Sequence, residues 1–228
     1  MARDSVILRG SFTAAISGGV TPRALHRMLA EEPFLFRIPW DRTHIFWVDE
    51  RCVPQSDPAS NYGAAREDFL NRIPIPIEQI HPMPGNIPPE DGAMKYQKEL
   101  MDCLDPPAGE LPVLDLVLLG LGKDGHSASL FPGQESLDEK ERLVLAVKSG
   151  NPNVNRLTMT LPVLNNARRI VFMVAGREKA SVVRSVLEDR QADLPAQRIQ
   201  PIHGKPTWLL DCEAASGRRR INPSTTDA

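Results

Sequence analysis

Cysteine is scarce in this sequence. Only three of the 228 residues are cysteines, Cys52, Cys103 and Cys212, and none belongs to a CxxC pair or has a histidine at metal-ligand spacing. This excludes the disulfide framework of a small secreted protein and provides no local pattern for a metal centre. We therefore expect free thiols in a reducing cytoplasm and no bound metal.

Long apolar runs and an excess of positive charge are also absent. No run approaches the roughly 20 residues that a membrane-spanning helix needs, and residues 1–12 lack the apolar core of a signal peptide. The formal net charge of -2 provides no basic field for nucleic acid. We expect neither a membrane nor a nucleic-acid partner, so a small anionic ligand would have to be held by local cations and backbone amides.

The composition that is present, 41% hydrophobic and 25% charged residues, is that of a globular protein long enough to bury a core. There is no internal repeat and no low-complexity tract. The proline-rich residues 74–89 cannot form a continuous helix, because proline lacks the amide hydrogen and fixes φ. We interpret this segment as an extended connection rather than an interdomain linker, and expect a single domain over residues 1–228.

Apolar segments of strand length alternate with segments of helical periodicity. The sequence predicts strands at residues 12–17, 43–48, 79–81, 113–119, 142–147, 157–160, 169–175 and 208–210, and helices at 22–31, 61–72, 91–103 and 177–188, with a short helix near the C-terminus. This order predicts an α/β fold, a doubly wound and mainly parallel sheet with helices on both faces. Ligands of such sheets bind beyond the carboxyl ends of the strands, so the motifs that follow strands matter most.

The first such motif is ISGGVTP, residues 16–22. Gly18 and Gly19 permit a tight turn that exposes amide hydrogens, and Thr21 is predicted to cap the next helix, with Pro22 in its first turn. Exposed amides and a helix dipole together form an anion site. A plain strand-to-helix turn remains the alternative, because the motif has neither the Walker nor the dinucleotide glycine pattern.

The second motif is WVDERC, residues 47–52, which places Asp49, Glu50 and Arg51 directly after a predicted strand. A charge triplet of this kind is usually a solvated surface run. Its position at the end of an apolar strand, ahead of the SNY sequence at residues 60–62, instead favours side chains that face a ligand crevice.

The third motif, GLGKDGHSASLFPG at residues 120–133, follows the most apolar predicted strand, and its His126 can be a turn residue or a catalytic one. Asp124 lies two residues earlier. A carboxylate that accepts a hydrogen bond from one ring nitrogen leaves the other nitrogen free to act as a base. Downstream, Arg156 and Lys179 could supply charge-assisted donors to a phosphate, although each alone is typical of a surface charge.

Taken in order, these motifs resemble the 6-phosphogluconolactonases along nearly the whole chain. The matching stretches are ISGGVTP, FWVDERCVPQSDPASNYG (46–63), IPIPIEQIHPMPGN (73–86), LDLVLLGLGKDGHSASLFPG (114–133), RLTMTLPVLNNARRIVFMVAG (156–176) with Lys179, and PTWLLDCEAA (206–215). No single stretch is specific, but their combination is.

The resemblance implies a modified doubly wound fold, shared with glucosamine-6-phosphate deaminases. It also implies hydrolysis of 6-phospho-D-glucono-1,5-lactone to 6-phosphogluconate in the oxidative pentose phosphate pathway, with His126 as general base and Asp124 as its orienting partner. The implied phosphate and substrate ligands are Gly18, Gly19, Thr21, Arg51, Arg156 and Lys179. The reaction requires no metal or other cofactor, and we expect a monomer or a weak homo-oligomer.

Two features depart from the family pattern. Position 123 is Lys where many relatives carry an acidic residue, and we expect this side chain to point into solvent. Family members usually also have a strand and a helix ahead of the segment that residues 8–12 resemble. Because this chain begins only a few residues earlier, the first strand–helix pair is expected to be missing.

Two other functions are compatible with the same fold. Glucosamine-6-phosphate deaminases typically carry a tyrosine or phenylalanine after the DE pair and a glutamate five residues after the DGH histidine, where this sequence has Arg51 and Phe131. A non-catalytic sugar-phosphate sensor needs the anion site but not the pair of Asp124 and His126, and is usually joined to a DNA-binding module. The hydrolase is therefore favoured over both.

Overall fold

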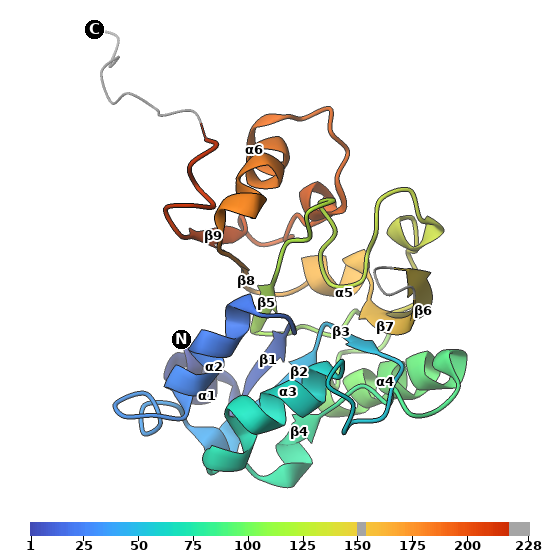
Figure 1. Cartoon of the computed structure of the whole chain (residues 1–228). Coiled ribbons are helices and arrows are strands. Elements are labelled where there is room, and N and C mark those ends of the chain that lie inside the picture. Colours follow the sequence, from blue (N-terminus) through green and yellow to red (C-terminus); the bar gives the residue numbers. More distant parts are fainter. Residues whose placement is uncertain (150–153, 219–228) are drawn as a thin grey trace, which may run out of the picture.

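A six-stranded parallel sheet is the frame of the computed structural model, which describes residues 1–149 and 154–218 (Figure 1). Its strands are β1 (Phe12–Ile16), β2 (Thr43–Trp47), β4 (Ile80–His81), β5 (Leu116–Leu119), β8 (Ile170–Val174) and β9 (Thr207–Leu210). They lie in the order β4-β2-β1-β5-β8-β9. Every residue of β1 is buried, as expected for a strand covered on both faces, and the predicted mainly parallel sheet is confirmed.

A second, antiparallel sheet takes up two segments that were predicted simply as further strands. In it, β7 (Val154–Met159) is the central strand and pairs with β6 (Val144–Ser149) on one side and β3 (Asp49–Arg51) on the other. The link between β6 and β7 is too short for a parallel crossover, so the two strands can pair only as antiparallel neighbours. The chain therefore passes from the main sheet to the second sheet at the DER sequence that follows β2.

The helices are α1 (Ala2–Arg9), α2 (Thr21–Leu29), α3 (Asn61–Asp68), α4 (Pro89–Leu104), α5 (Leu161–Asn165) and α6 (Ala180–Glu188). Because parallel crossovers are right-handed, the connections that run from β1 out to β4 and those that return through β5 to β9 place their helices on opposite faces. Figure 1 shows α2 and α3 side by side, while α4 packs against β6 and β7. Within the described ranges no helix is long and apolar enough to cross a membrane.

Three of the predicted helices are wrong in extent or kind. The helix predicted at residues 61–72 ends at Asp68, because Phe69 leaves the helical conformation with φ -153° and buries its ring in the core, and a 3₁₀ turn follows at Leu70–Arg72. Likewise, the helix predicted at 177–188 begins as a 3₁₀ turn, Arg177–Lys179. Residues 212–217 form turns instead of the predicted C-terminal helix.

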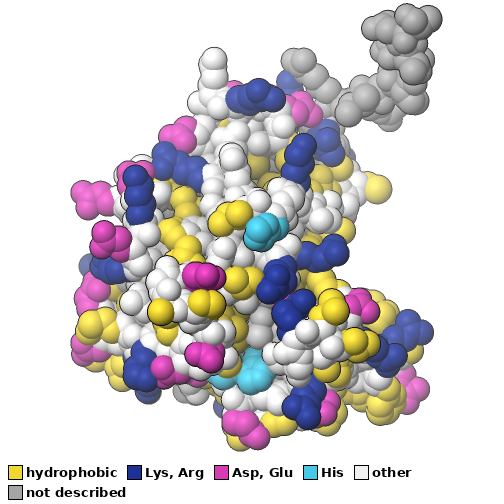
Figure 2. All heavy atoms as spheres, turned by 180° about the vertical axis from the view of Figure 1, so that it is seen from behind, with side chains coloured by type: hydrophobic (Ala, Val, Ile, Leu, Met, Phe, Trp, Pro, Cys, Tyr) yellow, Lys and Arg dark blue, Asp and Glu magenta, His cyan; other side chains and the backbone are white. Residues whose placement is uncertain are grey.

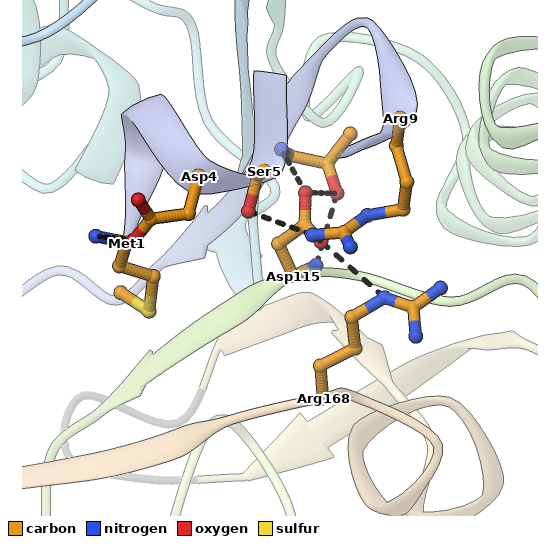
Figure 3. A network of polar contacts seen from close by, with 7 residues as sticks. Met1, Asp4, Ser5, Arg9, Asp115 and Arg168 are labelled. Atoms are coloured by element: carbon orange, nitrogen blue, oxygen red, sulfur yellow. Dashed lines mark hydrogen bonds and ion pairs between the residues drawn. The ribbon is translucent and has the colours of Figure 1, made fainter. Parts of the chain in front are cut away.

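The helix α1 was not predicted, and it is anchored to the sheet through the buried carboxylate of Asp115, directly before β5 (Figure 3). Arg9 donates to Asp115 Oδ1 at 2.6 Å, and the Thr13 backbone N–H donates to Oδ2 at 3.0 Å. Arg168 Nε lies 3.4 Å from Oδ1. A helix therefore precedes β1, and within the described residues no strand precedes that helix.

The surface carries both signs of charge. On the face drawn in Figure 2, basic and acidic side chains are interspersed, in keeping with the formal net charge of -2.

His26 on α2 is an ionisable group inside the core. Its side chain is buried, and its ring stacks on Phe69 with centroids 4.8 Å apart. Burial lowers the pKa of His26 to about 4, although the nearby Asp68 carboxylate acts in the opposite direction. The imidazole is therefore neutral in the folded protein at pH 5 and above.

We predict that the free energy of unfolding falls as the pH decreases from 6.5 to 4. A histidine in the unfolded chain takes up its proton in this range and folded His26 does not, so stability present above pH 6.5 is lost as the pH falls. A pKa difference of about 2.5 corresponds to about 3 kcal/mol in all, of which about 2 kcal/mol is lost between pH 7 and pH 5. Urea denaturation at these two pH values should show a smaller loss in His26→Phe than in the parent. The same pH dependence in both proteins would contradict this assignment.

Candidate active site

A crevice of about 270 Å³ opens at the carboxyl ends of β1, β5 and β8. It lies where the strand order reverses, since the chain leaves β1 toward β2 and leaves β5 toward β8. Ligands of open α/β sheets bind at such a switch point. Seven of the eight predicted site residues line it: Gly18, Gly19, Thr21, Arg51, His126, Arg156 and Lys179.

The eighth predicted residue, Asp124, contacts His126 directly. His126 Nδ1 lies 2.5 Å from Asp124 Oδ1, and the His126 backbone N–H donates to the same oxygen at 3.1 Å. A Cβ atom at position 122 would lie 2.1 Å from His126 Nδ1, so glycine is required beneath the pair. Partial burial acts to raise the pKa of Asp124, but the hydrogen bonds and charge of His126 outweigh it and lower this pKa. The carboxylate is thus ionised and fixes the ring.

The Phe131 ring contacts both the histidine and a cation. Its centroid lies 4.6 Å from that of His126, and the Arg156 guanidinium carbon lies 5.7 Å from it. The side chain is buried. The position that distinguishes the two enzyme classes of this fold is therefore in direct contact with the candidate base.

The ISGGVTP turn leaves the start of α2 uncapped. The N-cap is Val20 and not Thr21 as predicted, because Val20 already has the helical φ and ψ of -78° and -40° and Thr21 is the first residue of the helix. No side chain caps this end, and its first turn holds no acidic residue. Gly19 makes the turn with φ +92°. The amides at the start of α2 are therefore available to an anion, as are the positive ends of their dipoles.

The two carboxylates of the DER triplet are buried rather than solvated, and Arg51 is half-buried. Glu50 is 3% exposed, and its carboxylate accepts the backbone N–H groups of Arg51, Asn61 and Tyr62 at 2.7–2.8 Å and the Ser60 hydroxyl at 3.0 Å. Burial raises the pKa of Glu50, against the pull of these four donors. This residue does not line the crevice; it joins β3 to the start of α3, whereas Arg51 beside it does line the crevice.

Cations converge on the crevice from three segments. Arg51 on β3 is the register partner of Arg156 on β7, and Lys179 precedes α6 and donates to the Leu121 carbonyl at 2.7 Å. Burial, and then the charge of Arg51, lower the pKa of Arg156. Burial also lowers the pKa of Lys179. A bound anion would offset both effects, which makes this a site for negative charge.

The Lys123 side chain is exposed, as expected, yet it also borders the crevice. Its charge contributes to the lowered pKa of Lys179.

Asn61 lines the crevice and was not predicted as a site residue, whereas Asp49 belongs to the triplet that was expected to face it and does line it. Asn61 Nδ2 donates to the Asp49 carbonyl at 2.9 Å, and the Ser129 hydroxyl donates to Asp49 Oδ2 at 2.6 Å. A Cβ atom at position 18 would lie 1.9 Å from Asn61 Oδ1, so Gly18 is required by this close approach. The available signal was an asparagine that directly follows the helix-capping serine of SNY.

Together, the sheet and the crevice define a doubly wound α/β protein with cationic side chains and a histidine–carboxylate pair at its switch point. Residues 1–208 match the family described as glucosamine-6-phosphate isomerases/6-phosphogluconolactonase. The chain belongs to this family, as the motif resemblance implied.

Its relatives support the assignment. The chain is 42% identical over 212 residues to a 6-phosphogluconolactonase of Nostoc sp., covering 91% of this chain and 85% of the relative. The crystal structure of a 6-phosphogluconolactonase from Thermotoga maritima superposes with a TM-score of 0.79 at 31% identity, over 92% of this chain and 89% of that one. A monomeric glucosamine-6-phosphate deaminase, with a TM-score of 0.79 but 23% identity over 94% and 91% of the two chains, shares the fold.

We predict that Glu50→Gln lowers the free energy of unfolding by about 2 kcal/mol or more, because the new amide NH₂ group faces buried donors that a carboxylate satisfies. Chemical denaturation measures this loss. The matched control is Glu67→Gln on α3, the helix that Glu50 contacts; the Glu67 side chain is 80% exposed, and this substitution should change stability by less than about 0.5 kcal/mol. Equal losses of stability in the two variants would contradict the structural role of Glu50.

Proposed function

We propose that this protein hydrolyses 6-phospho-D-glucono-1,5-lactone to 6-phosphogluconate, within the oxidative pentose phosphate pathway. The observation that carries the proposal is the contact of His126 Nδ1 with Asp124 Oδ1, 2.5 Å apart, at the edge of a crevice to which Arg51, Arg156 and Lys179 contribute cations. The names of the curated relatives point to the same reaction.

His126 acts as the general base. Because Asp124 accepts the Nδ1 proton, Nε2 keeps its lone pair and takes a proton from the attacking water. The water oxygen bonds to the lactone carbonyl carbon, and collapse of the tetrahedral intermediate breaks the bond to the ring oxygen. That oxygen leaves with the proton held on the imidazolium, so the histidine returns to its starting state.

The phosphate binds at the uncapped start of α2, through the amides near Gly18, Gly19 and Thr21 and the charges of Arg156 and Lys179. Arg51 contacts the substrate from β3. Holding a non-reacting group at a fixed site places the carbonyl over His126, so that binding energy from the phosphate assists the reaction at the other end of the sugar.

Phe131 favours the hydrolase over a deaminase. A deaminase of this fold typically has a glutamate at this place, which is associated with acid–base chemistry on the sugar ring. Here the position holds a buried apolar ring against His126, so that second titratable group is absent. A sensor would not need the histidine–carboxylate pair at all.

We predict that His126→Ala lowers kcat/KM for freshly prepared 6-phosphogluconolactone by about 100-fold or more, because general base catalysis typically contributes 100-fold to 10,000-fold. Rates are corrected for spontaneous hydrolysis, and binding of 6-phosphogluconate is measured by calorimetry to show that the site persists. His203→Ala, at an exposed histidine, is the control and should match the parent. Unchanged turnover in His126→Ala would contradict a catalytic role and leave His126 as a structural residue of the turn.

The phosphate site predicts substrate selectivity. Gluconolactone without its phosphate should have a kcat/KM about 100-fold lower or more, since two charge-assisted hydrogen bonds are worth about 1.5–3 kcal/mol each. Lys179→Met should narrow the ratio of the two kcat/KM values, because it affects only the phosphorylated lactone. Comparable values for both lactones in the parent protein would refute the assigned phosphate site.

A further inference from the structure

A second cluster of reactive side chains lies at the β4 edge of the main sheet, and none of its members lines the crevice. It consists of His44 on β2, His81 on β4 and Cys103 on α4. His44 Nδ1 and His81 Nε2 are 3.0 Å apart. Cys103 Sγ lies 3.5 Å from the first nitrogen and 3.7 Å from the second. Two imidazole nitrogens and one sulfur therefore converge on one point.

These separations are close to those of a tetrahedral zinc site. Zinc–nitrogen bonds of about 2.05 Å and a zinc–sulfur bond of about 2.3 Å, at tetrahedral angles, place two nitrogens about 3.3 Å apart and each nitrogen about 3.6 Å from the sulfur. A hydrogen-bonded histidine pair requires only the first contact. The thiol sulfur lies from both nitrogens at the separation expected between two ligands of one ion, and a bound metal explains this feature.

The surroundings of His81 fix its ring in the orientation of a ligand. Glu99 Oε1 lies 2.8 Å from His81 Nδ1, so this nitrogen donates its proton to the carboxylate and Nε2 presents a lone pair to the cluster. The ring also stacks on Phe46, with centroids 4.3 Å apart and planes at 9°. A carboxylate that orients a ligating histidine in this way is a regular part of zinc sites.

We propose that His44, His81 and Cys103 bind one Zn²⁺ ion, with water as the fourth ligand. His81 and Cys103 line a surface groove, through which water can reach the cluster. Imidazole and thiolate ligands suit zinc, and the charges of the ion, the thiolate and Glu99 sum to zero. The ion would tie the short edge strand β4 and the end of α4 to β2, independently of the reaction in the crevice.

Metal binding releases one proton. In the free protein Cys103 is a thiol at neutral pH, as an ordinary cysteine is. On binding, the thiol proton leaves to solvent and sulfur donates an electron pair to zinc. The proton on His44 Nδ1 moves to the other nitrogen of the same ring, which frees Nδ1 as a ligand. No group is oxidised or reduced.

The test uses Co²⁺ as a spectroscopic probe for Zn²⁺ in the full-length protein. We expect one Co²⁺ per chain, a thiolate-to-cobalt charge-transfer band that added Zn²⁺ removes, and release of one proton per Zn²⁺ at pH 7. Cys103→Ser should abolish the band, and His44→Asn should weaken Co²⁺ binding by about tenfold or more. Glu99→Gln should weaken it by 10-fold to 100-fold.

Matched controls separate this site from the other candidate ligands. Cys52→Ser, Cys212→Ser and His126→Ala should retain the band with unchanged affinity. Circular dichroism establishes whether each variant is folded. If Cys103→Ser does not fold, the test uses His44→Asn, because His44 is only partly buried. Absence of a thiolate band in the parent, its persistence in Cys103→Ser, or its loss in Cys212→Ser would each overturn the proposal.

Discussion

The buried carboxylate of Glu50 is the contact on which the arrangement of the crevice depends. It accepts two backbone amides at the start of α3, one from its own strand and the Ser60 hydroxyl. A carboxylate with four donors can replace the water that it loses on burial. This interaction holds the antiparallel sheet against the helix that follows β2. Arg51 from one element and Asn61 from the other are thereby brought to the same opening.

Close approach of backbone to side chain completes the site. Gly18 lets Asn61 reach the β1 turn, and Gly122 lets the imidazole of His126 lie flat over the β5 turn, since a Cβ atom at either position would overlap these side chains. The two glycines therefore place the anion site and the candidate base at the ends of adjacent parallel strands. A sugar with a phosphate at one end and a carbonyl at the other fits this separation of roles.

The sequence predicts the parallel sheet and the crevice well, because both follow from local signals. Buried strands are recognised by the length of their apolar segments. Glycine-rich turns at the carboxyl ends of these strands lie together in any doubly wound sheet. The second sheet could not be predicted in this way, since the pairing of β3 with β7 joins segments about 100 residues apart. Glu50 was taken for a crevice residue because its partners at the start of α3 are not adjacent in the sequence. The helix α1 was not predicted because Asp115, which anchors it, lies far along the chain.

The cluster of His44, His81 and Cys103 illustrates the same limit. Its members are spaced far beyond any metal-binding motif, so the sequence provided no reason to expect a metal. Parallel pairing of β2 with β4, and the packing of α4 beside them, bring the three residues together.

Phe131 is the opposite case, because a local sequence signal was sufficient. Its place five residues after His126 was informative, and its contact with that ring supports the interpretation.

The central claim is that one ligand spans the uncapped start of α2 and the pair of His126 and Asp124. The most direct test is a crystal structure of the protein with 6-phosphogluconate bound. The account predicts the phosphate against the amides near Gly19 and the side chains of Arg156 and Lys179, with the carboxylate carbon near His126 Nε2. A phosphate bound beside His126, or a ligand bound outside this crevice, would contradict it.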